Sequence, residues 1–171
     1  MNGRILVGDH DGVYVLRFEG DVRVTLCGSF DHYLEVMLQD RGLTSVMVDL
    51  TQAVAIDSTS LGVLAKLSLG LQAKCQQVPM LVCDVPDILR ILNNMGFDDV
   101  FSIVDENYSG KQNLAELPQA TDFDEAEMRQ RVIAAHQVLM GLNARNAATF
   151  KDLVSALEAE NEASNSRLTG S

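Results

Sequence analysis

The sequence predicts an α/β protein whose mixed β-sheet has a parallel core covered by α-helices, with two further α-helices at the C-terminus. Short apolar runs alternate with stretches of helical spacing between residues 45 and 104, which is typical of βα units and a parallel sheet. Residues 4–26 instead hold β-branched runs separated by turn residues, which indicates an antiparallel part. From residue 122 onward only helical spacing remains.

The N-terminal third is expected to begin with three strands. These are predicted over 4–8, 13–19 and 22–26, and the first two are expected to pair as a hairpin. Apolar residues at helical spacing then predict a helix over 30–38, with Ser29 as its N-cap.

The middle of the chain holds the predicted parallel strands and their helices. Apolar runs at 45–50, 79–85 and 100–104 do not alternate with polar residues, which is typical of strands buried on both faces. Helices are expected to begin at Leu61 and at Pro86, since proline is accepted in the first helical turn.

The chain divides into an α/β domain over 1–110, a polar linker over 111–121, a helical extension over 122–160 and a polar, disordered tail over 161–171. Each helix of the extension carries one apolar stripe, so together they predict an αα-hairpin. The stripes are explained equally by packing on the α/β domain and by pairing with a partner or a second copy of the chain, which would form a homodimer. The sequence leaves these alternatives open.

Charge and hydropathy restrict the partners and the compartment. The 171 residues carry a formal net charge of −11 and no cluster of Lys or Arg, so direct binding of nucleic acid is not expected. No apolar run approaches the ~20 residues of a membrane span, and no signal peptide is evident. We therefore expect a cytoplasmic protein without membrane insertion.

The cysteines and histidines are too dispersed to suggest a metal site or a disulfide framework. The cysteines are Cys27, Cys75 and Cys83, without a C-x-x-C motif. The histidines, His10, His32 and His136, lack the spacing of metal ligands. We expect no metal or cofactor, and we expect His32 and His136 to be surface or half-buried residues of helices.

The stretch "AVAIDSTSLGVLAKLSLGL", residues 53–71, places a carboxylate and three hydroxyls between a strand-like segment and a helix. Such residues cap helices, although one cap suffices and contributes about 0.5–2 kcal/mol. The alternative is a modification site, because the carboxyl ends of strands in open α/β sheets are where ligands and partners bind. A phosphate there would add roughly −1.5 to −2 charge at pH 7, which would block docking and leave the fold intact.

Catalytic motifs are absent from the sequence. It contains no G-x-S-x-G, no P-loop and no G-x-G-x-x-G, and no histidine lies in a segment that obviously returns to this edge of the sheet. The sequence therefore indicates a binding module and not an enzyme.

The residues around this stretch resemble the STAS domain of bacterial anti-sigma factor antagonists, over about residues 10–105 and most closely over 46–104. That family carries an apolar strand ending in Asp-Leu-Ser/Thr, then an apolar residue followed by Asp-Ser-Ser/Thr-Gly-Leu-Gly. The matching residues are Val48-Asp49-Leu50-Thr51, then Ile56-Asp57-Ser58-Thr59-Ser60-Leu61-Gly62. Ser60 departs from the pattern, since the family has glycine there. The later "ILRILNNMGFDDVFSIV" is similar to the family's leucine-rich helix, Gly-Phe turn and last strand.

The resemblance implies the STAS fold and a partner-switching function. An anti-sigma factor with serine kinase activity would phosphorylate Ser58, with Thr59 as the fallback acceptor, and a PP2C-type serine phosphatase would remove the phosphate. The unphosphorylated chain would bind the anti-sigma factor, and Asp57 would orient the hydroxyl or contact the kinase. The partner-binding residues would be Asp57, Ser58, Thr59, Ser60, Leu61 and Gly62. The alternative is a STAS scaffold subunit of a transporter or sensory complex, in which the hydroxyls are only caps.

Overall fold

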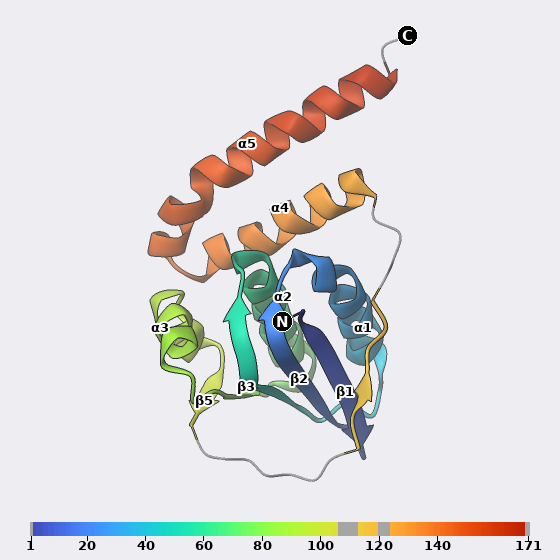
Figure 1. The fold of residues 1–171 in the computed structure, drawn as a ribbon, viewed down its shortest axis with the longest axis vertical. Coiled ribbons are helices and arrows are strands. Elements are labelled where there is room, and N and C mark those ends of the chain that lie inside the picture. The colour runs from blue at the N-terminus through green and yellow to red at the C-terminus, as the bar shows by residue number, and fades with distance from the viewer. Residues whose placement is uncertain (1, 106–112, 120–123, 170–171) are drawn as a thin grey trace.

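A six-stranded mixed sheet in the order β5-β4-β3-β2-β1-β6 forms the centre of the computed structural model, which describes residues 2–105, 113–119 and 124–169 (Figure 1). Its strands are β1 (Arg4–His10), β2 (Val13–Val22), β3 (Ser45–Ile56), β4 (Met80–Val82), β5 (Ser102–Val104) and β6 (Ala115–Glu116). The strands β2, β3, β4 and β5 are parallel, and β1 is antiparallel to both of its neighbours. The predicted α/β class and mixed sheet are confirmed.

The first two strands form the predicted hairpin, closed by Asp11 and Gly12, both with positive φ. The predicted strand over 22–26 is wrong, because β2 ends at Val22 and residues Val24–Leu26 form the 3-10 helix η1. The amide of Val24 donates to Asp57 Oδ2 at 2.7 Å, so this segment is held by a side chain and not by a strand.

Helices α1 (Cys27–Gln39) and α2 (Ser58–Cys75) pack on one face of the sheet, and α3 (Pro86–Asn94) lies near its β5 edge (Figure 1). Helix α1 begins before the predicted N-cap, so Ser29 lies inside the helix. Helix α2 is the central helix of the core, and its buried leucines are Leu61, Leu64, Leu67 and Leu71. None of the helices in the described ranges has the length and apolar character that crossing a membrane requires.

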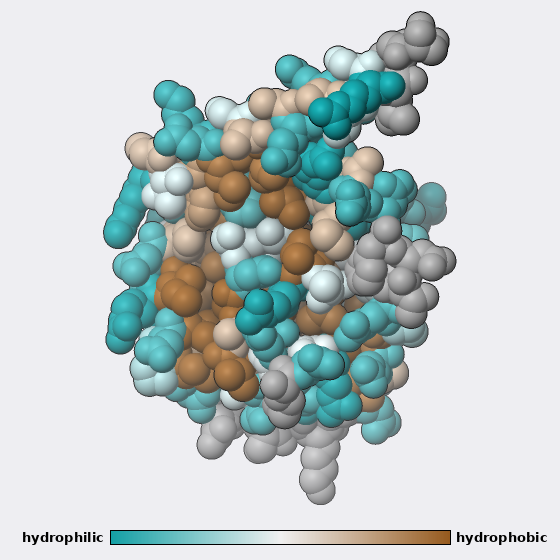
Figure 2. Space-filling view, turned by 45° about the horizontal axis from the view of Figure 1, so that its top comes forward, coloured by the Kyte–Doolittle hydropathy of each residue, from teal (hydrophilic) through white to brown (hydrophobic). Residues whose placement is uncertain are grey.

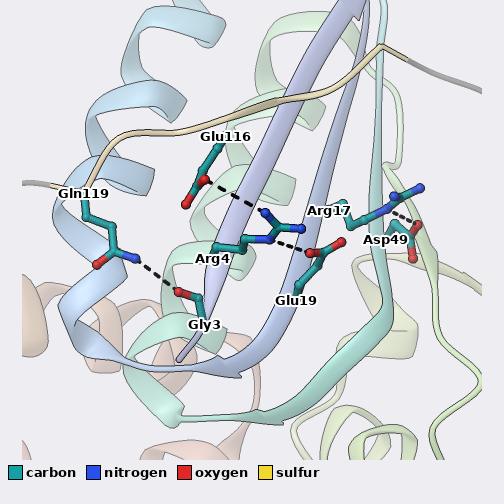
Figure 3. A network of polar contacts seen from close by, with 7 residues as sticks. All are labelled: Gly3, Arg4, Arg17, Glu19, Asp49, Glu116 and Gln119. Carbon is teal, nitrogen blue, oxygen red and sulfur yellow. Dashed lines mark hydrogen bonds and ion pairs between the residues drawn. The ribbon is translucent and has the colours of Figure 1, made fainter. Parts of the chain in front are cut away.

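The opposite face of the sheet carries charged pairs along β1, β2 and β3 (Figure 3). Arg4 Nε lies 2.6 Å from Glu19 Oε1, and Arg17 Nε lies 3.1 Å from Asp49 Oδ2. These residues alternate along β1 and β2 with buried core residues such as Phe18, as the period of a strand requires. The same face also carries a small buried apolar cluster of Val15, Met47 and Val82, so the charged pairs occupy only part of it.

The predicted αα-hairpin is present as α4 (Glu125–Leu142) and α5 (Ala144–Thr169), and α4 lies across the end of the domain where β3 ends and α2 begins (Figure 1). Of the two alternatives for these helices, the structure shows packing on the α/β domain. Helix α5 continues to Thr169. The structure therefore has a helix over residues 161–169, where a disordered tail was predicted. Its last turns are rich in Ala, Glu and Asn and have no apolar stripe, so helical periodicity did not reveal them.

The linker contains the short strand β6, which pairs with β1 through Leu6 and Val7. Two residues are too few to produce an alternating pattern, so the strand was not predicted. The predicted boundaries at 110–112 and 120–122 lie outside the described residues, and the division into domains stays a prediction.

Candidate functional site: the junction of β3 and α2

Asp57 connects the end of β3 to the start of α2 and caps the helix. Its Oδ1 accepts a hydrogen bond from the amide of Ser60 at 2.8 Å, and its Oδ2 accepts one from the amide of Val24 at 2.7 Å. The first bond is a helix N-cap, and the second fixes the segment that leads into α1. Asp57 thus holds two backbone amides of this loop, while the hydroxyl of Ser58 bonds to a different residue.

The three hydroxyls after Asp57 lie in different environments. Ser58 is half-buried and begins α2, whereas Thr59 and Ser60 are 6% and 1% exposed. Ser60 Oγ lies 3.4 Å from the sulfur of Cys27 on α1. Because Asp57 supplies the cap, the Ser58 hydroxyl is not needed for capping, and among these three hydroxyls it is the least buried.

The cysteine beneath Ser60 is buried between α1 and α2. Cys27 is 1% exposed, and burial raises the pKa of its thiol to about 12, against the opposing effect of the hydrogen bond with Ser60. A thiolate is therefore scarce here, and the Cys27–Ser60 contact is part of the packing between α1 and α2.

His136 from α4 bonds directly to Ser58. Its Nε2 lies 2.8 Å from Ser58 Oγ, and its Nδ1 lies 2.7 Å from the carbonyl oxygen of Val132. A carbonyl can only accept, so Nδ1 carries a proton, and in the neutral ring Nε2 accepts the hydrogen bond that Ser58 donates. His136 is 2% exposed, so the expectation of a surface or half-buried residue is wrong for this histidine. Its ring packs edge-on against Phe150 of α5, with ring centroids 5.0 Å apart. The site is therefore closed by both helices of the extension.

Next to this bond, the backbone of α4 packs against a glycine of α2. A Cβ atom added to Gly62 would lie 2.3 Å from the carbonyl oxygen of Ala135 and 2.7 Å from its Cβ. Gly62 and Ala135 are both buried. Only residues this small allow the two helices to approach so closely, so the motif glycine of α2 is a contact point for α4.

Polar contacts attach the extension to α1 and α3 as well. Arg131 Nε lies 3.8 Å from Asp31 Oδ2 on α1. The side chain of Asn146, which is 2% exposed, donates to the carbonyl of Met95 just after α3, and Asn143 donates to the same oxygen. The extension is therefore anchored at α1, α2 and α3.

A serine hydroxyl bonded to an imidazole is also the first element of a hydrolytic site. In such sites a further group, usually a carboxylate, orients the histidine, whereas here the partner of Nδ1 is a backbone carbonyl within α4. A pocket of about 480 Å³ lies elsewhere, beside the turn between β1 and β2, and includes Gly8, His10 and Val15. No group of three or more His, Cys, Asp or Glu in the described ranges is arranged to bind a metal ion.

Sequence reasoning placed Ser58 at a strand-to-helix junction but did not find His136. The two residues are 78 positions apart, and no histidine was expected to return to this edge of the sheet. The predicted partner-binding residues 57–62 are brought together around the first turn of α2, and those from Thr59 to Gly62 are buried in the structure. The only sequence signal for His136 is its place on the apolar stripe of α4, which does not specify a partner.

Comparison with known proteins identifies the family of the α/β domain. Residues 4–110 match the model of the STAS domain family. Among solved structures, the chain is similar to an anti-sigma factor antagonist from Mycobacterium paratuberculosis, with 22% identity, a TM-score of 0.53 and coverage of 61% of this chain and 87% of that chain. It is also similar to the anti-sigma factor antagonist SpoIIAA in its unphosphorylated form, with 13% identity, a TM-score of 0.52 and coverage of 61% and 89%.

The chain matches no curated protein sequence. At these identities the two structures support the fold, and α4 and α5 lie beyond the residues that the family model matches. The family match spans more than half of the chain and includes the junction at Ser58, so the protein belongs to the STAS domain family.

Proposed function

We propose that this protein is an anti-sigma factor antagonist that acts by partner switching, with Ser58 as the phosphorylated residue. The observation that carries the proposal is the division of roles at the junction: Asp57 caps α2, which leaves the half-buried Ser58 hydroxyl free of any capping role. Thr59 is buried, which makes it a poorer acceptor.

The surface beside Ser58 suits a protein partner. The end of β3 exposes Val54 by 66%, and the neighbouring Ala55 is also exposed. Figure 2, which brings this end of the molecule forward, shows several groups of hydrophobic side chains on the face, with polar side chains between them. Exposed apolar side chains next to a modifiable hydroxyl offer a docking surface that a charge would disrupt.

In the proposed cycle, an anti-sigma factor with serine kinase activity binds the unmodified chain in the cytoplasm and releases its sigma factor. The kinase transfers the γ-phosphoryl group of ATP to Ser58 Oγ: the new Oγ–P bond forms, the bond between the γ-phosphorus and ADP breaks, ADP leaves, and the hydroxyl proton passes to solvent. The dianion must then be desolvated against the partner, which weakens binding and releases the chain. A PP2C-type phosphatase hydrolyses the phosphoserine and restores the hydroxyl.

The test compares Ser58→Ala and Ser58→Asp for binding to the cognate anti-sigma factor. We expect Ser58→Ala to bind and Ser58→Asp to bind much more weakly, with both variants retaining the circular dichroism spectrum of the native chain. Undiminished binding by a folded Ser58→Asp chain would contradict the charge-based mechanism.

One observation favours a second function, that of an unphosphorylated STAS scaffold subunit in a transporter or sensory complex. The Ser58 hydroxyl already has a partner within the chain, His136, which gives it a structural role. Intact-mass measurement of the protein purified from its own cells separates the two functions. A phosphate on Ser58 supports the switch, and an unmodified chain under all growth conditions supports the scaffold.

A further inference from the structure

Helix α4 occupies the surface on which the proposed switch depends. It bonds to Ser58 through His136, packs its backbone on Gly62 through Ala135, and pairs with Asp31 through Arg131. These contacts come from a segment outside the family match, and they cover residues of the family motif. Any partner that docks on this part of α2 must displace α4.

The contact with His136 conflicts with a phosphate on Ser58. The hydroxyl oxygen is 2.8 Å from His136 Nε2, so a phosphate cannot occupy the direction of this hydrogen bond unless the imidazole moves. Movement of the imidazole would disturb its packing on Phe150 of α5 and the hydrogen bond from its Nδ1 to the carbonyl oxygen of Val132. Forcing additional atoms into such a packed contact shifts the elements that form it.

The hairpin is attached by apolar and polar contacts together. Leu139 and Phe150 belong to the core cluster of the domain, whereas the polar anchors are single hydrogen bonds or ion pairs, each worth about 0.5–1.5 kcal/mol. Losing a few of these anchors changes the docked population by one or more orders of magnitude. Most of α5 beyond Val154 is exposed, so release of the hairpin would expose Leu139 and Phe150 but would break no hydrogen bond between strands of the sheet.

We infer that the α4–α5 hairpin is an internal competitor for the Ser58 surface: it docks only on the unphosphorylated chain, and it must leave before a partner or kinase can bind there. This inference rests on the proposed function of Ser58. Two consequences follow from thermodynamic linkage. If a phosphate weakens docking of the hairpin, the docked hairpin must oppose phosphorylation to the same extent. Docking also lowers the apparent affinity for the partner, which equals the intrinsic affinity multiplied by the fraction of chains whose hairpin is undocked.

Hydrogen–deuterium exchange of the full chain tests the inference without any partner. Phosphoserine is installed at position 58 during synthesis and compared with the unmodified chain. We expect the amides of α4 to exchange about tenfold faster or more, as the loss of one or two anchors predicts, while β2 and β3 keep their protection. The control carries phosphoserine at Ser102, an exposed residue of β5 near the opposite end of the sheet, and should leave α4 unchanged.

A second pair of variants releases the hairpin without a phosphate. Ala135→Leu adds bulk where Ala135 meets Gly62, whereas Ala134→Leu adds the same bulk at the preceding, exposed position of α4. We expect faster exchange in α4 for Ala135→Leu only, again with β2 and β3 protected.

Equal exchange of α4 in the unmodified chain and in the chain with phosphoserine at position 58 would overturn the inference. So would loss of protection in β2 and β3 together with α4, since the hairpin and the sheet would then open as one unit. Because these measurements need neither kinase nor partner, the inference can fail while the Ser58 switch stands. The detection of a phosphate on Ser58 in cells is a separate result that bears on the switch alone.

Discussion

The interactions that stabilise the α/β domain differ from those that attach the α4–α5 hairpin to it. In the domain, α2 presents large apolar side chains such as Leu64 and Leu67 to the sheet, and both are completely buried. The hairpin also contributes apolar side chains to this core, such as Leu139 and Phe150, and it adds a close approach at Gly62 and polar contacts of His136 and Asn146. The apolar core stabilises the domain, while the close approach and the polar contacts depend on a few specific atoms and are therefore sensitive to small chemical changes.

The largest effect is expected from the core of the domain. Phe18 is fully buried and packs edge-on against Phe30, with ring centroids 5.1 Å apart. Phe18→Ala should lower the free energy of unfolding by about 3–5 kcal/mol, because the cavity removes contacts at the centre of the fold. Urea unfolding followed by circular dichroism measures this loss.

The matched control for Phe18→Ala is Val54→Ala, at a position 66% exposed, which should change stability by less than about 0.5 kcal/mol. If Phe18→Ala increased hydrogen exchange in the hairpin alone, the domain would not be the stable unit, and the comparison between the two regions would be wrong.

A smaller effect is expected at the anchor beside α3. Asn146→Ala removes the hydrogen bonds that its side chain donates to the carbonyls of Met95 and Leu139, which costs about 1–3 kcal/mol, while the carbonyl of Met95 keeps its hydrogen bond from Asn143. We expect the loss to appear as faster exchange in α4 and the first turns of α5. A uniform increase over β2 and β3 as well would indicate that the hairpin and the domain unfold as one unit.

The contact at Gly62 should be weakened by a single methyl group. Gly62→Ala places a Cβ against the backbone of Ala135, which costs about 1–3 kcal/mol, although alanine's better helix propensity returns about 1 kcal/mol. Gly141→Ala is the matched control, since nothing lies within 4 Å of its added Cβ, and it should stabilise α4 by about 0.5–1 kcal/mol. Faster hydrogen exchange of α4 in Gly62→Ala and slower exchange in Gly141→Ala would support a close contact at Gly62. Equal changes in the two variants would contradict it.

The smallest effect concerns the reactivity of Cys27 beneath Ser60. Its pKa of about 12 predicts that alkylation by iodoacetamide at pH 8 is much slower for Cys27 than for the half-buried Cys75. The thiol ionises near pH 9 in the unfolded chain and near pH 12 in the folded chain. Burial of the neutral thiol therefore contributes fully to the free energy of unfolding below pH 9, and this contribution is lost as the pH rises toward 12. Peptide mapping after timed alkylation measures both rates, and fast labelling of Cys27 in the native chain would show that the α1–α2 contact opens.

Sequence reasoning was successful where a periodic apolar pattern determines the structure. The parallel strands, α2 and the two C-terminal helices each carry such a pattern, and their existence was predicted. The strand expected over 22–26 was wrong because Asp57, distant in sequence, binds the amide of Val24 and stabilises a 3-10 turn. A side-chain contact of this kind leaves no trace in the local pattern.

The candidate site shows the same limit. Ser58 was identifiable because the motif lies within one short segment, but its bond to His136 joins residues on separate elements and depends on how α4 docks. Likewise, the buried environments of Thr59 and Ser60 could not be distinguished from that of Ser58, since all three are consecutive hydroxyl residues. Helix geometry separates them by turning each residue toward a different neighbour.

The two hydrogen bonds of Asp57 have a consequence for how this loop tolerates change. The negative charge that the fold needs at the start of α2 is provided by position 57, which holds the amides of Ser60 and Val24. The neighbouring position 58 makes its side-chain bond to a separate helix. The backbone of the loop is thus held by position 57, so a change of the side chain at position 58 alters the contact with α4 and leaves the two backbone hydrogen bonds in place.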